Sequence, residues 1–182
     1  MEVAFYTLGC KVNRYDTEAM RDKFRAAGYD VVDFSQPADI YIINTCTVTH
    51  GGARKSRKIT RQARRRSREA LIAVVGCYPQ VSPEEVLASG EIDLVVGTTG
   101  RSQIVELVEQ ALKADKPLKL VQPVEEEEEF EPLEVKEIKG RTRATIKIQD
   151  GCDQFCSFCI IPYARGRVRS RPAEKVAAEA RR

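Results

Sequence analysis

Four short runs of aliphatic and β-branched residues recur in the first 112 residues, each followed by a turn and a stretch of helical periodicity. Such runs are typical of strands buried on both faces, as in a parallel sheet covered by helices. The expected strands are residues 3–8, 40–44, 71–75 and 92–96, with a weaker one at 29–32. The expected helices are residues 14–29, 52–69, 82–89 and 101–114. This pattern predicts a small doubly wound α/β domain over residues 1–114.

Three of the six cysteines follow three of these strands. Cys10, Cys46 and Cys77 each lie within three residues of the carboxyl end of a strand. The carboxyl ends of an open parallel sheet form one edge, along which ligands bind, so these side chains should converge. A single buried cysteine is ordinary in a protein core. Three cysteines at the same step of the fold instead predict a shared metal site.

The other three cysteines, Cys152, Cys156 and Cys159, lie in one short segment. They follow an apolar alternation at 144–148, which predicts a strand that runs into a loop. Thiolates gathered this closely repel one another unless a cation binds them. A closed zinc site takes four ligands, and the only histidine, His50, is distant in the sequence. Three thiolates suit a four-iron cluster with one open iron, and the alternative is an inert buried cysteine cluster.

Residues 54–68 are strongly basic and contain no acidic side chain. On a helix, these cations surround all but a narrow face formed by Ile59 and Ala63. A solvated helix face is the ordinary explanation, but no opposite charge at i+4 relieves the repulsion here. Contact with a phosphate backbone would relieve it. We therefore expect RNA contact by Arg54, Lys55, Arg57, Lys58, Arg61, Arg64, Arg65 and Arg66.

Residues 115–139 differ in composition from what precedes them. Three prolines interrupt the pattern, and Glu125 to Glu129 form an unbroken acidic run, so we expect an extended linker. Residues 140–182 then begin a second domain, in which Val176, Ala177 and Ala180 share one helix face. Ahead of this helix, arginine recurs at every second position from 165 to 171. This spacing lines one face of an extended segment, which faces either solvent or an anionic ligand.

Composition excludes several classes of protein. No apolar run approaches the ~20 residues that span a bilayer, and the first residues lack the basic region of a signal peptide. We therefore expect a cytoplasmic protein with no membrane partner. In a reducing compartment, six cysteines indicate metal or redox chemistry and argue against a disulfide framework.

The segments around the cysteines resemble a known family. The spacing of Cys152, Cys156 and Cys159, with Phe158 before the last, is similar to the signature of radical S-adenosylmethionine enzymes. The flanking residues 147–152 and 160–166 resemble the methylthiotransferases among them. Three further segments resemble the cysteine segments of that family's amino-terminal domain: Thr7-Leu8-Gly9-Cys10-Lys11-Val12-Asn13, Ile43-Asn44-Thr45-Cys46-Thr47-Val48 and Val75-Gly76-Cys77-Tyr78.

The resemblance implies two [4Fe–4S] clusters and S-adenosyl-L-methionine as cofactors. Cys152, Cys156 and Cys159 would be the catalytic residues and hold the cluster that binds S-adenosylmethionine. Cys10, Cys46 and Cys77 would hold an auxiliary cluster that takes part in sulfur delivery. The implied reaction adds a methylthio group to C2 of N6-threonylcarbamoyladenosine next to the anticodon. The implied partners are tRNA, bound at its anticodon loop, an electron donor and a sulfur source.

The resemblance matches only the front part of the family's chain. Residues 140–182 are therefore expected to be the first βα unit of a truncated radical S-adenosylmethionine partial barrel, and the chain to be an inactive fragment. Other functions stay open from the sequence. The protein could be a non-catalytic iron–sulfur RNA-binding module or a zinc-stabilised nucleic-acid protein. It could also be a methylthiotransferase that acts on isopentenyladenosine in tRNA or on a ribosomal protein.

Overall fold

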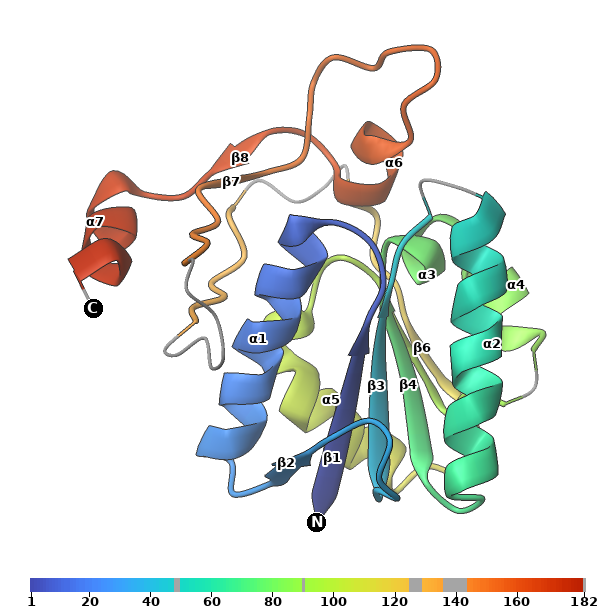
Figure 1. Ribbon diagram of the computed structural model, residues 1–182. Coiled ribbons are helices and arrows are strands. Elements are labelled where there is room, and N and C mark those ends of the chain that lie inside the picture. Colours follow the sequence, from blue (N-terminus) through green and yellow to red (C-terminus); the bar gives the residue numbers. More distant parts are fainter. Residues whose placement is uncertain (48–49, 90, 125–128, 136–143, 182) are drawn as a thin grey trace.

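The amino-terminal part of the chain is a parallel α/β fold with helices on both faces of its sheet (Figure 1). The computed structural model describes residues 1–47, 50–89, 91–124, 129–135 and 144–181. The sheet contains β1 (Glu2–Thr7), β2 (Asp30–Val32), β3 (Ile40–Thr45), β4 (Leu71–Gly76), β5 (Leu94–Val96) and β6 (Leu118–Leu120). Their spatial order is β2-β1-β3-β4-β5-β6, and each neighbouring pair is parallel.

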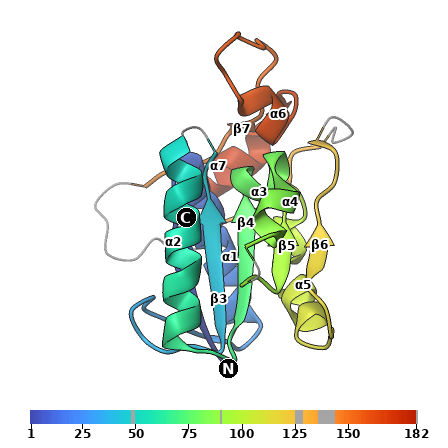
Figure 2. The same cartoon turned by 90° about the vertical axis from the view of Figure 1, so that its right-hand side faces the viewer.

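Helices cover the sheet as the apolar strands require. One face carries α1 (Lys11–Ala26) and α5 (Ile104–Ala111), which is preceded by the short 3₁₀ helix η1 (Arg101–Gln103). The other face carries α2 (His50–Arg66), α3 (Cys77–Val81) and α4 (Pro83–Leu87) (Figure 2). The predicted strands and helices of residues 1–114 are thus confirmed, with boundaries that shift by a few residues.

The central strands explain the uninterrupted apolar runs of the sequence. Every residue of β3 and β4 is buried. Successive side chains of a strand point to opposite faces of the sheet. Ile40 and Ile42 therefore pack in the cluster under α1 and α5, whereas Tyr41 and Ile43 pack with Ile59 of α2 and its neighbours. Both faces are apolar because both are covered.

The strand order reverses between β1 and β3, from which the chain winds outward in both directions. The register brings Thr7 opposite Asn44, and Thr45 opposite Gly76, so β1, β3 and β4 end at the same edge. In open α/β sheets this reversal is where ligands bind, in the crevice beyond the carboxyl ends. The fold therefore places the segments after β1, β3 and β4 at a position typical of a site.

The expectation of an extended linker over residues 115–139 is wrong for its described part. β6 lies inside this range and pairs with β5. Leu133 and Val135 are buried against Tyr15 and Ala19 of α1. These apolar side chains join the folded unit because they find apolar partners on it. The acidic residues 125–128 and residues 136–139 lie outside the described residues.

The carboxyl-terminal segment adds little regular structure. It contains β7 (Gln149–Asp150), α6 (Ile161–Arg165), β8 (Arg169–Ser170) and α7 (Ala173–Arg181), and β7 pairs with β8 in antiparallel fashion. Residues 144–148 do not form the expected strand, and β7 begins just after them at Gln149. Ile148 is 59% exposed, and the neighbouring Lys147 side chain is instead drawn into buried ion pairs. On α7, Val176 and Ala177 are only half-buried and Ala180 is exposed.

No helix in the described ranges combines the length and the apolarity that crossing a bilayer requires.

Candidate metal centre

The first cysteine triad, Cys10, Cys46 and Cys77, lies at the carboxyl edge of the sheet. Cys10 is the last residue before α1, Cys46 directly follows β3, and Cys77 is the first residue of α3 after β4. The three strands are adjacent and parallel, so residues far apart in the sequence meet at one edge. Cys10 is exposed, Cys46 is intermediate and Cys77 is buried. One side of the triad thus faces solvent and the other faces protein.

Asn13 lies between these cysteines and is fully buried. Its Nδ2 donates to the Leu8 carbonyl at 2.9 Å and to the Thr45 carbonyl at 2.8 Å, which ties the end of β1 to the end of β3. The thiols of Cys10 and Cys77 contact its Oδ1 at 3.9 Å and 4.0 Å. The thiols of Cys10 and Cys77 therefore lie around one oxygen atom of Asn13.

Gly9 allows the third cysteine to approach. Its φ of +107° lies in a region that favours glycine. A Cβ added at Gly9 would lie 2.7 Å from Cβ and 3.1 Å from Sγ of Cys46. The segment before Cys10 therefore passes directly beside Cys46, and any side chain at position 9 would push the two apart.

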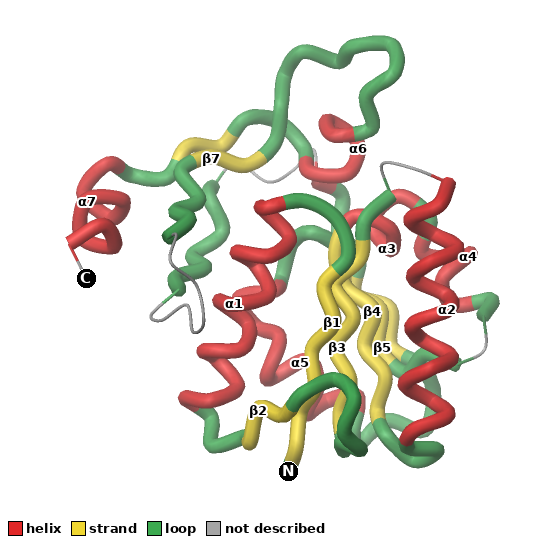
Figure 3. Tube along the Cα trace, in the orientation of Figure 1, coloured by secondary structure: helices red, strands yellow, loops and turns green. Residues whose placement is uncertain are grey.

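The second triad, Cys152, Cys156 and Cys159, lies on a loop that projects beyond the carboxyl edge of the sheet (Figure 3). A turn closes with the Cys159 amide donating to the Cys156 carbonyl at 2.9 Å. Cys156 is exposed, and Cys152 and Cys159 are intermediate. Phe158 is 91% exposed. The second triad thus lies on a loop that the described part of the protein covers only slightly.

The base of this loop is attached to the sheet edge through α6. The Cys152 amide donates to the Gly166 carbonyl at 3.0 Å, which closes the loop just after α6. Helix α6 packs against α3, the helix that begins at Cys77. Thr98, after β5, donates through Oγ1 to the Ala164 carbonyl at 2.6 Å. The segment carrying the second triad therefore rests on the edge that carries the first (Figure 2).

A buried charge network joins the two segments. Asp16 of α1 accepts from Arg101 at 2.5 Å and from Lys147 at 2.9 Å, and lies 3.3 Å from Arg165. Asp150 accepts from Arg165 at 2.9 Å and pairs with Lys147 at 2.6 Å. The five side chains are at most 7% exposed. Glu131, 15% exposed, adds a third carboxylate at 2.9 Å from Arg101.

The network determines the charge states of its members. Burial alone raises the pKa of Asp16, but Arg101, Lys147 and Arg165 lower it, and the net pKa lies below its usual value. The pKa of Asp150 is lowered for the same reasons, with Arg165 as the strongest neighbour. Burial also raises the pKa of the Cys77 thiol, against the opposing effect of Arg165 and Arg101. Both aspartates are thus carboxylates at neutral pH.

The arginines spaced at every second residue do not line one solvent-facing side of a strand. Arg165, Arg169 and Arg171 are buried, whereas Arg167 is exposed. Their partners belong to the protein. Arg165 binds Asp150, Arg169 donates to the Arg165 carbonyl at 2.6 Å, and Arg171 pairs with Glu179. The solvent-facing interpretation is wrong for Arg165, Arg169 and Arg171, because these side chains are buried and bind carboxylates and carbonyls of the chain itself.

The donor sets fit iron–sulfur clusters in kind and number. Across the described ranges, no three His, Cys, Asp or Glu side chains are placed to hold a single metal ion. A cluster of several irons makes a different demand, because its thiolates bind different iron atoms. The first triad offers three thiols from three backbone segments around Asn13, with one side open. The second offers three thiols on one loop.

Helix α2 presents the expected basic surface. Ser56, Ile59, Thr60 and Ala63 form its buried face, which confirms the narrow apolar stripe and widens it with two hydroxyls. The exposed side has a groove of about 510 Å³ lined by Arg54, Arg57, Lys58, Arg61, Gln62 and Arg65. Arg57 is partly occupied, since it donates to the Tyr78 hydroxyl at 2.9 Å and to Glu85 at 2.6 Å. We call these six residues the basic groove.

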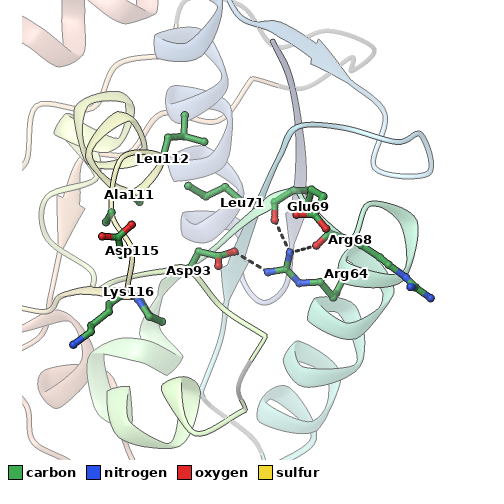
Figure 4. Close-up of a pocket in the computed structure, with 12 residues that line it drawn as sticks. Arg64, Arg68, Glu69, Leu71, Asp93, Ala111, Leu112, Asp115 and Lys116 are labelled. Carbon is green, nitrogen blue, oxygen red and sulfur yellow. Dashed lines mark hydrogen bonds and ion pairs between the residues drawn. The ribbon is translucent and has the colours of Figure 1, made fainter.

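Arg64 of the same helix has an internal role. It donates to the Arg68 and Ala70 carbonyls, each at 2.7 Å, and to Asp93 at 2.8 Å. Figure 4 shows Arg64 pointing at Asp93 in a pocket of about 270 Å³. This pocket lies at the amino edge of the sheet, beside the first residue of β4, away from both triads. Arg64 therefore serves the fold in this structure.

The sequence alone did not predict the residues that join the two triads. Asn13 and Asp16 lie within or beside the first cysteine segment and were given no role, and Arg165 was noted only as the first of the alternating arginines. A usable signal existed for Asp16, because it lies on the apolar face of α1 among Tyr15, Ala19 and Met20. A charged residue at a core position is almost never left without a partner.

The chain is similar to several known proteins. A sequence profile of the family described as "Uncharacterized protein family UPF0004" matches residues 2–97. "Threonylcarbamoyladenosine tRNA methylthiotransferase MtaB" of Bacillus subtilis is 47% identical over 178 residues, which are 98% of this chain and 40% of that protein. The protein of the same name from Aquifex aeolicus is 44% identical, over 97% of this chain and 43% of its own. "tRNA-2-methylthio-N(6)-dimethylallyladenosine synthase" of Bartonella bacilliformis is 34% identical, over 99% and 41%. The chain thus spans about 40% of the length of these relatives.

Proposed function

Because this chain belongs to uncharacterized protein family UPF0004, whose profile covers its first cysteine triad, we propose that it carries the two cysteine sites of a tRNA methylthiotransferase. The proposed substrate is N6-threonylcarbamoyladenosine next to the anticodon of tRNA, and the proposed location is the cytoplasm. Relatives named for threonylcarbamoyladenosine are 47% and 44% identical, against 34% for one named for dimethylallyladenosine. This difference supports the choice of substrate. The resemblance to the methylthiotransferases found in the sequence is confirmed by these names.

The observation that carries the proposal is the placement of both triads at one edge of one fold. Cys10, Cys46 and Cys77 end three adjacent strands, and α6 holds the loop of the second triad against the same edge. A reaction that joins sulfur to a carbon needs the sulfur site and the activating site in a defined relation. Holding them so is catalysis by positioning.

The residues divide into three proposed roles. Cys10, Cys46 and Cys77 would hold the auxiliary [4Fe–4S] cluster, where the sulfur to be transferred is kept. Cys152, Cys156 and Cys159 would hold the second [4Fe–4S] cluster, at which S-adenosylmethionine supplies the radical that activates the substrate carbon. Asn13 would hold the ends of β1 and β3 at a fixed separation, through its two donated hydrogen bonds. An electron donor and a sulfur source complete the proposed partners.

The basic groove is the proposed contact with the tRNA backbone. Arg54, Lys58, Arg61 and Arg65 are exposed on one side of α2 and recur at intervals of three and four residues. Such a stripe follows a line of phosphates, releases counterions and carries no sequence readout. Arg64 is left out of this contact because its guanidinium is engaged within the fold.

Anaerobic reconstitution with iron and sulfide tests the two-cluster assignment. The chain should turn brown and show the electron paramagnetic resonance signals of two reduced clusters. Cys156→Ala should remove about half of the bound iron and leave the signal of the auxiliary cluster, since each triad binds on its own. Colourless protein that binds zinc instead would overturn the assignment.

Binding of threonylcarbamoyladenosine-containing tRNA tests the basic groove. Lys58→Gln with Arg61→Gln should weaken binding and reduce the slope of log K against log salt by about 1 for each phosphate that the protein no longer neutralises. The matched control is Lys113→Gln with Lys116→Gln, which removes the same charge from exposed positions elsewhere. Equal effects of the two pairs would show that the groove makes no special contribution.

Turnover separates the proposed enzyme from a non-catalytic iron–sulfur RNA-binding module. The chain would be fused to the part of a relative that lies beyond the matched region. After reconstitution, the fusion protein should methylthiolate tRNA in the presence of a reductant and S-adenosylmethionine. Nucleoside mass spectrometry detects the product and identifies the modified base. Cluster loading and tRNA binding without any cleavage of S-adenosylmethionine would favour the binding module.

A further inference from the structure

Arg165 comes from the segment of the second triad but inserts its side chain beside the first. It is the last residue of α6 and is only 4% exposed. Its Nη2 donates to Oδ1 of Asn13 at 2.6 Å. That same oxygen atom is contacted by the thiols of Cys10 and Cys77. The guanidinium therefore shares its acceptor with two of the three sulfurs of the first triad.

The surroundings of Arg165 hold it there. Asp150 accepts two hydrogen bonds from its Nη1, at 2.9 Å and 3.0 Å. Asp16 lies 3.3 Å from its Nη2 and is itself shared with Arg101 and Lys147. The planar guanidinium suits this role because its fork of donors binds several acceptors at once, whereas an ammonium is a point charge.

A buried cation beside the first triad changes the electrostatic potential at a cluster that the thiolates bind. Reduction of a cluster held by three thiolates adds negative charge to a site that protein covers on one side. Net charge, hydrogen bonds around the sulfurs and burial are the quantities that set cluster reduction potentials.

We propose that Arg165 is a positioning residue that sets the reduction potential of the auxiliary cluster at Cys10, Cys46 and Cys77, and so makes that potential depend on the docking of the second cysteine loop. This inference rests on the proposed function. The inference goes beyond the proposed function, because it assigns a residue from the segment of the second triad a role in the chemistry of the first. Undocking the loop would withdraw the cation and make the auxiliary cluster harder to reduce.

The test is a redox titration of the auxiliary cluster alone. In the full chain, Cys152, Cys156 and Cys159 are replaced by alanine so that a single cluster is reconstituted. Arg165→Gln should then lower the ratio of reduced to oxidised cluster tenfold at a fixed ambient potential, which is a shift of about 59 mV for a one-electron couple. Arg165→Lys, which keeps the charge, should restore most of the parent protein's potential. The electron paramagnetic resonance signal reports the reduced fraction and needs no enzyme activity.

Arg167→Gln is the matched control, because Arg167 lies two residues away and is exposed. It removes the same charge and should leave the potential unchanged. Equal potentials in the Arg165→Gln and Arg167→Gln proteins would overturn the inference and leave the proposed function standing. If the parent protein binds no cluster at all, the proposed function fails, and the inference with it.

A second variant covers the case in which Arg165→Gln does not assemble a cluster. Asp150→Asn keeps Arg165 in the chain and keeps one oxygen acceptor for its Nη1, and it removes one carboxylate that neutralises the guanidinium. The cluster should then become easier to reduce, with a tenfold larger ratio of reduced to oxidised cluster at the same ambient potential. A merely structural role of Arg165 predicts lower stability in this variant with an unchanged potential, and that result would overturn the inference.

Discussion

The two cysteine triads of this protein are built in opposite ways. Cys10, Cys46 and Cys77 are brought together by the sheet, from positions separated by whole strand–helix units. Cys152, Cys156 and Cys159 are neighbours in the sequence and need only a loop. The first triad is partly buried and organised around Asn13, whereas the second is on a projecting loop whose Phe158 is 91% exposed. Long-range folding thus makes one site and local spacing makes the other.

This difference predicts different dependences on the fold. The first triad requires the core that Ile40, Ile42 and their partners form, because each ligand comes from a different strand. The second requires only that its loop be held at its base. What links them is the buried network of Asp16, Asp150 and their cations, which ties the loop segment to α1 and η1. Three experiments test this contrast.

The largest effect is expected from the first triad itself. Cys46→Ala, in a chain whose second triad is also replaced by alanine, should abolish bound iron. The two remaining thiols, of Cys10 and Cys77, cannot hold a cluster that uses three. Iron and sulfide analysis after anaerobic reconstitution measures the loss. Circular dichroism serves as the control, since the sheet should melt as in the parent protein. Iron content that is unchanged would mean that the ligands lie elsewhere.

An intermediate effect is expected from the network. Asp16→Asn should lower the free energy of unfolding by about 3–5 kcal/mol, because it leaves Arg101, Lys147 and Arg165 facing a neutral amide in a buried site. Urea denaturation measures the change. Glu18→Gln on the same helix is the matched control. It removes a half-exposed pair with Arg21 at 3.3 Å, which should cost at most about 1 kcal/mol. Similar losses for both variants would show that burial of Asp16 adds nothing.

The smallest effect is expected from acid below about pH 4. The pKa of Asp150 is lowered because Arg165, Lys147 and Arg101 outweigh its burial. A carboxylate of this kind stabilises the folded state fully above its unfolded pKa, ~3.9, and the contribution is lost as the pH falls below that value. Hydrogen exchange of residues 144–181, corrected for its intrinsic pH dependence, should therefore stay constant from pH 7 to about 4 and accelerate below. Loosening already between pH 7 and 5 would contradict this assignment.

The amino-acid sequence alone determined the parallel sheet and the place of the first triad. The apolar runs at 40–44 and 71–75 are uninterrupted because both faces of β3 and β4 are covered. Once strands are recognised as parallel, the residues after them must share an edge. The second triad was equally plain, since its spacing is local. These features depend on short periodicities or on a general rule of sheets.

Only the tertiary structure decided the partners of Asp16 and the position of Arg165. Asp16 meets Lys147 and Arg165 across 131 and 149 residues, and Arg101 across 85. No period or spacing encodes such pairs, because each depends on how two segments dock. The tertiary structure also decided the places of β6, which pairs with β5, and of Leu133, which packs against α1. Charges in a folded chain are satisfied by whichever partners packing brings near, and packing is a property of the whole molecule.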